Sequence, residues 1–506
     1  MKRFDLSPKP LRAALSGIGL MLLLAGSLKA QSVWRTNDGD WFTAGNWAGG
    51  VPNESVAARF QVTENSPGAV HVSVGSGTAT ALAFQIFHGK EVQIDLADGA
   101  VVSATGQLWR IGWTSGSGGA TLQFNGPGTG EATVKLAAVI VGSDAFANDS
   151  QLVFSGTGLK VVQETPADYI IVGRFGTNQK MRVENGADVT ARYVALSDAN
   201  VGGGREGHEL HVIGEGSRLA TVGRLTIGAT GEGARDNKAF VSGNGATLSV
   251  GDYLTIGTSV GYGGNSLEVS NGGLVEVTGT TTISTYDGNG GDNSGANRLS
   301  IRQGGTFKAG SVIVTHGLLQ LEEGGVLEAI ASPVALSVKN GARVELAGSG
   351  LHSNVSVQLE SGARMAVGVS DGSGERAGAS TLVLGSGVTF ANGSVLELSL
   401  FDNGGDQIEL LSGGALEGTI TLELKWLGTT LPSEGWQLFT GAVENITAAF
   451  VLSGIDPELW DLSNFNQEGG WEVRAIPEGA VGLYAMFGMA LLAYSTFRSK
   501  QAPGRS

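Results

Sequence analysis

The chain has 506 residues, of which 82 are glycine and none is cysteine, and its formal net charge is −15. The glycine share is roughly twice the usual ~7%, without the period of three that collagen needs, which indicates a chain rich in turns. The lack of cysteine excludes disulfides, thiolate zinc sites and cysteine nucleophiles, and the negative charge argues against nucleic acid and anionic lipid surfaces as partners. No cofactor is expected, and stability has to come from burial and backbone hydrogen bonds.

Residues 1–30 have the layout of a secretory signal peptide. Lys2, Arg3, Lys9 and Arg12 form a basic lead, residues 13–24 are almost wholly apolar, and small residues follow up to Ala30. This order predicts export and cleavage by signal peptidase after Ala30. An uncleaved amino-terminal anchor is the alternative.

Residues 31–99 are predicted to form an amino-terminal cap and the first coils of the fold. Trp34, Trp41 and Trp47 lie close together among Asp-Gly and Asn-Gly turns. A rod of strands needs a cover at its end, and large apolar side chains can close its core. The same three indoles could instead stack on sugars, so a glycan-binding site is the competing interpretation.

Between residues 100 and 384 the chain repeats itself. One phrase, Leu-x-Ile-Gly or a variant, has its last apolar residue at Ile111, Val141, Val172, Leu196, Ile227, Ile256, Ile283 and Val314. A second phrase, apolar-x-Asn-Gly-Ala or a variant, has its glycine at Gly186, Gly216, Gly245, Gly272, Gly304, Gly324, Gly341, Gly362 and Gly387. Both phrases recur along the chain with variable spacing.

Short alternating segments separated by Asn-Gly corners predict three strands in each repeat. One such repeat cannot bury its inward side chains alone, but stacking the next coil ~4.8 Å above it covers them and pairs the backbone groups. We therefore predict an all-β fold, a right-handed parallel β-helix (solenoid), with around ten coils and a length of roughly 50 Å. Antiparallel hairpins or a β-sandwich are the competing folds.

The sequence pattern changes over residues 385–475, but it is still typical of β-strands. Residues 396–400, 406–410, 419–424 and 435–439 alternate cleanly between apolar and polar side chains. No break in composition separates this stretch from the repeats. We interpret it as the final coils and the carboxyl-terminal cap.

Motifs that would carry catalysis or metal binding are weak. Residues 257–261 match a nucleophile elbow and residues 202–207 match a dinucleotide fingerprint, but neither is followed by the helix that its motif requires. His208 and His211 form the closest histidine pair, yet on a strand their side chains would point to opposite faces. No metal site is predicted from them.

Two acidic turns, residues 287–293 and residues 402–406, combine Asp with flexible backbone as calcium loops do. Neither has a calcium-loop spacing, so we interpret both as ordinary turns. An enzyme of the β-helical lyase or glycosidase type would need paired carboxylates and a basic residue on one face. Arg174, Arg182, Arg192, Arg218 and Arg224 recur without a fixed carboxylate partner pattern, and no catalytic pair is nominated.

The carboxyl end is predicted to cross a membrane. Pro477 and Glu478 precede an apolar run over residues 480–497, which Arg498 and Lys500 follow. As a helix this run would reach ~27 Å, about the thickness of a bilayer core, with the basic end in the cytoplasm. A permanent single-span anchor is one interpretation of this segment.

Residues 476–506 also resemble the PEP-CTERM sorting signal of exported Gram-negative proteins, although Gly479 stands where the second proline is expected. The resemblance implies retention at the inner membrane and processing by an exosortase-like membrane transpeptidase. The opening over residues 33–60 resembles surface proteins with autotransporter-associated β-strand repeats.

Together these features predict an exported, non-catalytic structural protein of the cell surface or extracellular matrix, with exopolysaccharide as a possible partner class. The alternatives are an adhesin or glycan-binding surface protein, and a β-helix polysaccharide lyase or glycosidase.

Overall fold

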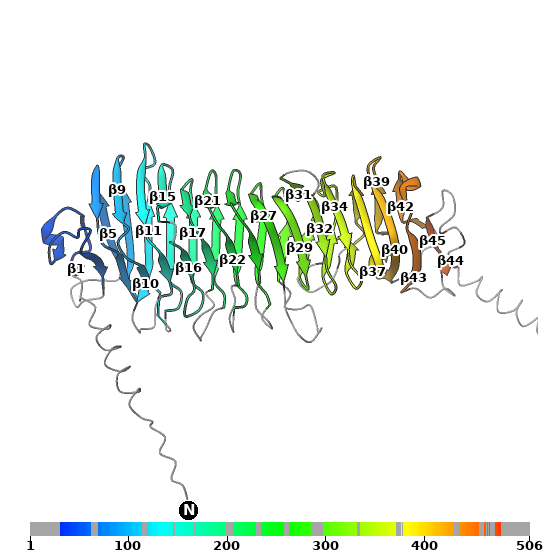
Figure 1. Cartoon of the computed structure of the whole chain (residues 1–506), viewed down its shortest axis with the longest axis horizontal. Coiled ribbons are helices and arrows are strands. Elements are labelled where there is room, and N and C mark those ends of the chain that lie inside the picture. Colours follow the sequence, from blue (N-terminus) through cyan, green and yellow to red (C-terminus); the bar gives the residue numbers. More distant parts are fainter. Residues whose placement is uncertain are drawn as a thin grey trace, which may run out of the picture.

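The computed structural model describes residues 31–476, except 62–68, 114–118, 145–146, 166–167, 198–205, 229–233, 258–262, 285–296, 331–333, 371–375, 377, 430–434, 455–459, 462, 464 and 466–470. Figure 1 shows the strands stacked along the long axis, from β1 (Gln31–Trp34) to β45 (Glu472–Ala475). The chain forms a parallel β-solenoid of about 13 turns with almost no helix, which confirms the predicted solenoid. At ~4.8 Å a turn the rod is ~60 Å long. The repeat phrases predicted around ten of these turns, and the other turns lie before and after the repeats, where first and final coils were expected.

A complete turn contributes one strand to each of three faces, but some turns near the ends of the described chain have no strand on face 2. Face 1 consists of β2 (Asp38–Asp40), β5 (Ala69–Val74), β8 (Glu91–Leu96), β11 (Thr121–Asn125), β14 (Gln151–Ser155), β17 (Lys180–Glu184), β20 (Glu209–Ile213), β23 (Lys238–Ser242), β26 (Ser266–Ser270), β28 (Arg298–Ile301), β30 (Leu318–Leu321), β33 (Arg343–Leu346), β35 (Arg364–Val367), the second parts of β37 (Gly387–Phe401) and β40 (Ala415–Trp426), and β43 (Ala449–Ser453). Face 2 consists of β6 (Gly77–Thr80), β9 (Ala100–Ala104), β12 (Ala132–Leu136), β15 (Leu159–Gln163), β18 (Asp188–Ala191), β21 (Arg218–Thr221), β24 (Thr247–Val250), the first parts of β27 (Leu274–Ser284) and β29 (Thr306–Thr315), and β31 (Val326–Ala329). A separate sheet of β36 (Thr381–Leu384), β39 (Gln407–Leu410) and β42 (Phe439–Gly441) follows along the chain.

Face 3 carries the candidate site described below. It consists of β1, β4 (Ala57–Phe60), β7 (Phe84–Phe87), β10 (Trp109–Trp113), β13 (Val139–Val141), β16 (Ile170–Val172), β19 (Val194–Leu196), β22 (Leu225–Ile227), β25 (Leu254–Ile256), the second parts of β27 and β29, β32 (Val334–Val338), β34 (Val355–Leu359) and the first parts of β37 and β40. Two short 3₁₀ helices, η1 (Ala44–Asn46) and η3 (Val443–Asn445), lie near the two ends of the described chain.

The first repeat phrase marks one stack of inward side chains. The eight predicted residues from Ile111 to Val314 pair with one another in unbroken register on face 3. The prediction that this phrase repeats once per coil is confirmed. The inward position has to be apolar in every coil because it is buried between the coils above and below.

The second phrase, by contrast, marks two different corners. From Gly186 to Gly324 its glycines lie between faces 1 and 2, but Gly341 and Gly362 lie between faces 3 and 1. There the amide of Gly341 donates to the carbonyl of Gly362, and the amide of Gly362 donates to that of Gly393. Gly387 was wrongly included: it begins β37, whereas Gly393, with φ 86°, occupies the corner. Corner glycines share a requirement for positive φ, so the sequence alone did not separate the two stacks.

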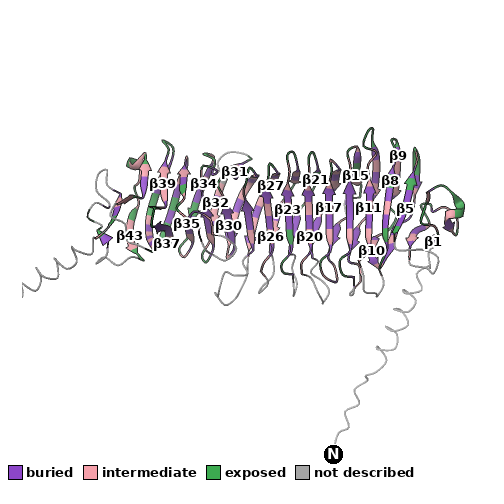
Figure 2. Ribbon diagram, turned by 180° about the vertical axis from the view of Figure 1, so that it is seen from behind, coloured by how far each residue is buried: buried purple, intermediate pink, exposed green. Residues whose placement is uncertain are grey.

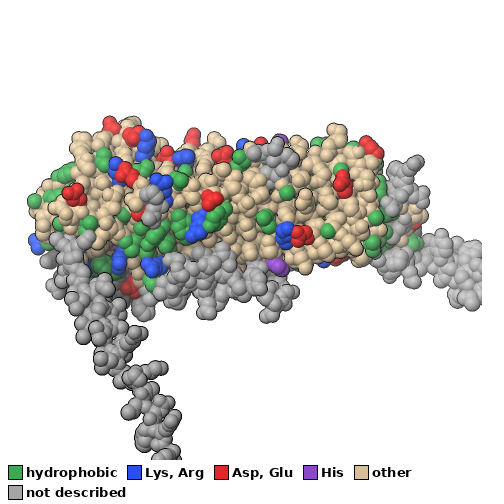
Figure 3. All heavy atoms as spheres, viewed as in Figure 1, with side chains coloured by type: hydrophobic (Ala, Val, Ile, Leu, Met, Phe, Trp, Pro, Cys, Tyr) green, Lys and Arg blue, Asp and Glu red, His purple; other side chains and the backbone are tan. Residues whose placement is uncertain are grey.

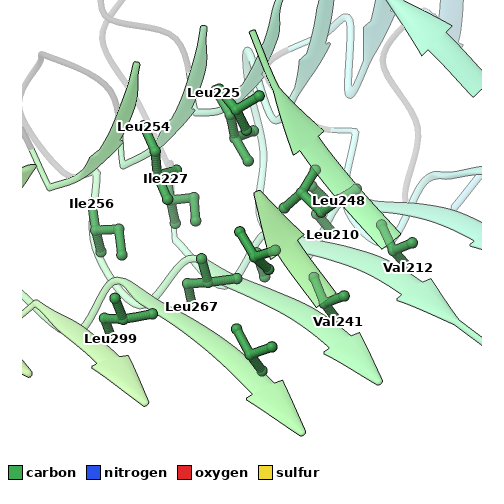
Figure 4. Packing of buried hydrophobic residues seen from close by; sticks show 14 of the residues in the cluster. Leu210, Val212, Leu225, Ile227, Val241, Leu248, Leu254, Ile256, Leu267 and Leu299 are labelled. Atoms are coloured by element: carbon green, nitrogen blue, oxygen red, sulfur yellow. The ribbon is translucent and has the colours of Figure 1, made fainter. Parts of the chain in front are cut away.

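The core is one continuous column of apolar side chains. Figure 4 shows Leu225, Ile227, Leu254 and Ile256 of face 3 facing Leu210, Val212, Val241 and Leu267 of face 1. Each fully buried aliphatic side chain contributes ~1.5–3 kcal/mol. Figure 2 shows the resulting buried bands along the strands, with exposed positions concentrated at the corners.

Both ends of the described rod carry antiparallel strands and aromatic clusters. At one end β3 (Trp47–Ala48) pairs antiparallel with β1. At the other, β41 (Trp436–Gln437) and β44 (Trp460–Asp461) pair antiparallel with β45, and β38 (Gly404–Gly405) folds back on β37. The Trp426, Trp436 and Trp460 rings lie within 5.8 Å of one another there. Such ends interrupt the parallel ladder that would otherwise offer open strand edges.

Within the described residues, no helix combines the length and the apolar character needed to cross a membrane. The predicted signal peptide, residues 1–30, and the predicted span, residues 480–497, lie outside the part of the chain that the structure describes.

Candidate functional site

The predicted processing residues lie outside the described part of the chain. These are Ala30 at the amino end and Pro477, Glu478, Arg498 and Lys500 at the carboxyl end. The acidic turn over residues 287–293 also lies outside it, as do most of the elbow motif over residues 257–261 and most of the fingerprint over residues 202–207.

The tryptophans considered for glycan binding are buried. Trp34, Trp41 and Trp47 are 1%, 0% and 3% exposed. The Trp47 ring lies 4.8 Å from that of Trp34 and 4.9 Å from that of Trp41, both edge to face. Their rings have no free face for a sugar, and their packing on Phe60 and Phe84 favours the capping interpretation.

His208 belongs to a buried ladder of polar side chains before the face 1 strands. Each member accepts a hydrogen bond from the backbone amide of the equivalent residue one coil earlier, over 2.9–3.2 Å; the members are Ser150, Gln179, His208, Asn237, Asn265 and Asn297. His211 lies on the outer side of face 1, where its ring stacks on Phe240 and Nε2 contacts Glu209. The two histidines therefore do not converge, and the described residues contain no group of metal-binding side chains.

The second acidic turn is occupied by protein groups. Asp406 is fully buried and forms a two-point ion pair with Arg376, and it also accepts from the amides of Ser380 and Ser399. Asp402 accepts from the amide and hydroxyl of Thr429. The two carboxylates are thus used in separate contacts rather than in one calcium site.

A charge cluster on the outside of face 1 is the arrangement that most resembles a glycosidase site. Glu397 is 3% exposed; its Oε1 binds Arg343 at 2.8 Å and also Arg364, and its Oε2 binds Lys425 at 3.1 Å. Burial alone would raise the pKa of Glu397, but these cations outweigh it and hold the pKa at about 2. An acid of that pKa cannot protonate a leaving group near neutral pH, and both oxygens are occupied. The cluster fits a structural role.

Face 3 carries an unusual set of outward side chains, which we call the arginine–aromatic face. Its central row is Arg59, Gln85, Arg110, Ile140, Ile171 and Ala195, which pair successively from β4 to β19. The strands place Trp109 and Ile111 in the core and Arg110 on the outside, because successive side chains alternate. Beside this row lie Phe87, Leu108, Trp113, Tyr169, Tyr193, Arg224 and Tyr253.

The arginines at both ends of this face lie against aromatic rings. The Arg59 guanidinium carbon is 4.2 Å from the Phe87 ring centre, and that of Arg110 is 5.0 Å from the Trp113 ring. At the other end the Arg224 guanidinium is 4.6 Å from the Tyr193 ring. Such stacking fixes the plane of a guanidinium while leaving its N–H groups at the rim.

An apolar stretch separates the two arginine ends. Ile140, Ile171 and Ala195 form a cluster of their own, against which Leu108, Tyr169 and Tyr193 pack, and this cluster is separate from the main core. In Figure 3, hydrophobic and basic side chains gather together on one part of the visible face, in contrast with the mixed charges elsewhere.

The charges on this face are not neutralised by carboxylates. Arg59, Arg110 and Arg224 of this face form no ion pair within the described part of the chain, and neither do Arg174 and Arg192, which lie next to β16 and β19 in the sequence. By contrast, eight arginines each pair with Asp or Glu: Arg182, Arg218, Arg235, Arg302, Arg343, Arg364, Arg376 and Arg474. The Nε atoms of Arg59, Arg174 and Arg192 and the Oε1 atom of Gln85 are buried without a hydrogen-bond partner. Arg224 instead donates to the Tyr253 hydroxyl at 2.6 Å, which raises the pKa of Arg224.

Sequence reasoning missed this face. It named Arg174, Arg192 and Arg224 but not the rings on which arginines stack, because stacking partners come from different coils. One local signal was available: Val139–Val141 and Ile170–Val172 are apolar at all three positions, where an outer face in contact with water would alternate. Such strands indicate an outer face that is also covered.

No protein-family model matches the chain, and no curated protein matches it.

Proposed function

We propose that the chain is an exported, non-catalytic structural rod of the cell surface or extracellular matrix, built as a right-handed parallel β-helix. The observation that carries the proposal is the continuous parallel pairing from β4 to the first part of β40 around one apolar core, which makes a stiff rod whose inward side chains are used for packing. In the outer charge cluster, both carboxylate oxygens of Glu397 are likewise used in contacts with other side chains of the rod. The rod provides length, and its capped ends oppose end-to-end association.

The route to the surface rests on the two terminal segments. We propose cleavage by signal peptidase after Ala30, retention at the inner membrane by residues 480–497, and processing near Pro477 and Glu478 by an exosortase-like transpeptidase. Support comes from the resemblance of residues 476–506 to the PEP-CTERM signal. Arg498 and Lys500 would hold the carboxyl end in the cytoplasm until processing.

Mass spectrometry of both ends of the mature protein, with fractionation of the cells, tests this route. The expected mature chain begins near residue 31, ends close to Glu478 and is recovered from the surface or matrix fraction. A mature chain that still reaches Ser506 would replace sorting with a permanent anchor. Recovery from the cytoplasm with residues 1–30 intact would refute export.

The non-catalytic part of the proposal has its own test. Purified protein is incubated with acidic and neutral polysaccharides, and reducing and unsaturated sugar ends are measured. We expect no release above a blank. Release that Glu397→Gln abolishes would establish the lyase or glycosidase alternative and would assign its acid to the cluster that we interpret as structural.

A further inference from the structure

We propose that the arginine–aromatic face is a binding site for an acidic polysaccharide whose chain lies along the solenoid axis. The proposal adds a ligand to the structural rod and holds whichever route delivers the protein. The full chain is acidic, with a net charge of −15, so a face whose arginines lack carboxylate partners stands out from its surroundings. An unpaired positive site in a negative protein selects for anionic groups placed at that site.

The arginines are held ready for carboxylates. Arg59 and Arg110 at one end and Arg224 at the other lie on aromatic rings, so their planes are fixed before a ligand arrives. A guanidinium held in this way can donate two parallel hydrogen bonds to one carboxylate, and prior ordering lowers the entropy lost on binding. Arg110 and Arg224 lie four coils apart, which is ~19 Å along the axis.

The stretch between the two ends fits sugar rings. Leu108, Tyr169 and Tyr193 are partly exposed there, and the tyrosine rings offer flat apolar surface on which a sugar ring can stack. Asp168 borders this row next to Tyr169, so the carboxylates of a ligand are expected to avoid that edge and lie over the arginine ends.

The backbone of face 3 argues against a peptide ligand. Parallel pairing joins each strand from β4 to β25 to both of its neighbours, so this face has no strand edge to which an extended peptide could add. A polymer that binds here uses side chains alone. A polysaccharide with one carboxylate on each sugar ring would contact the arginines at the two ends through its carboxylates and the apolar middle through its rings.

Calorimetric titration of the full-length protein with polygalacturonate, dextran and poly-L-glutamate tests the proposal. We expect binding to polygalacturonate that weakens with salt, and at least tenfold weaker binding to the other two polymers. Arg110→Gln and Arg224→Gln should each weaken polygalacturonate binding by roughly 10- to 100-fold, the range for loss of a charge-assisted hydrogen bond. Arg218→Gln is the matched control, because Arg218 is on face 2 and pairs with Asp188 at 3.0 Å.

Oligogalacturonates of graded length give a second readout. Affinity should rise steeply once the oligomer spans the ~19 Å between the two arginine ends and should then level off, because both ends are engaged at once. The proposal is overturned if polygalacturonate does not bind, if dextran or polyglutamate binds equally well, or if Arg218→Gln weakens binding as much as Arg110→Gln. Binding that grows evenly with length and ignores both arginines would indicate non-specific adhesion and would also overturn it.

Discussion

The backbone amide of Gln179 donates a 3.1 Å hydrogen bond to Nδ1 of His208, one coil further along the chain. Nδ1 must therefore be unprotonated, and the ring must be the neutral tautomer with its proton on Nε2. His208 is 0% exposed, and burial lowers its pKa to about 3. His208 thus accepts a backbone hydrogen bond as the asparagines of the next coils do. Unlike asparagine, it makes the stability of the fold depend on pH in the acid range.

We expect His208→Asn to remove that sensitivity. The unfolded chain protonates His208 below its ordinary pKa of 6.5, whereas the folded chain keeps it neutral down to about 3. Its contribution is therefore complete above pH 6.5 and falls by ~1.4 kcal/mol per pH unit as the pH drops towards 3. Denaturant midpoints at pH 7.5 and 4.5 should differ less in His208→Asn than in the wild type. His211→Asn is the control; equal pH dependence in wild type and His208→Asn would contradict the argument.

Asn265→Ala should destabilise the rod through the same ladder. Asn265 accepts from the Asn237 amide at 3.2 Å and donates to the Ala234 carbonyl at 3.0 Å and to Asn297 at 2.9 Å. Truncation leaves several buried groups unpaired, at ~1–3 kcal/mol each. Asn125→Ala is the control, because Asn125 bonds Asp95 on the outer side of face 1. If the urea midpoint shifts no more for Asn265→Ala than for Asn125→Ala, the buried polar ladder does not stabilise the rod as argued.

Glu397→Gln should lower the free energy of unfolding by ~3–5 kcal/mol, because Arg343, Arg364 and Lys425 would lose their shared anion. Since the folded pKa of Glu397 is about 2, against 4.5 ordinarily, its contribution is complete above pH 4.5 and disappears as the pH falls towards 2. The exposed pair of Glu360 with Lys339 supplies the control. Thermal melting should show at most ~1 kcal/mol for Glu360→Gln; similar losses for both variants would contradict burial as the cause.

Trp41→Ala and Phe42→Ala test the amino-terminal cap with adjacent residues. Trp41 is 0% exposed against Trp47 and Phe84, whereas Phe42 is 42% exposed. Removal of the buried indole should cost ~3–5 kcal/mol, and removal of the exposed ring should change little. Hydrogen exchange should show the loss first in β1, β4 and β5. Protection lost evenly along the rod would mean that the indole does not act as a local cover.

The solenoid and the inward stack from Ile111 to Val314 could both be predicted from the sequence. Both follow from local rules, since a strand buried on its inner side alternates and a tight corner needs positive φ. The burial of Trp34, Trp41 and Trp47 also agrees with the capping interpretation that their size suggested.

Which residues of different coils become neighbours depends on how the coils stack, and this could not be predicted from the sequence. Ladder members are separated by 29, 29, 28 and 32 residues from Gln179 to Asn297, and loops of unequal length absorb the differences. A fixed spacing therefore found neither the ladder through His208 nor the change of corner at Gly341. The arginine–aromatic face was hidden for the same reason: Arg59 meets Phe87 from the next coil, a contact that stacking creates and that no local pattern encodes.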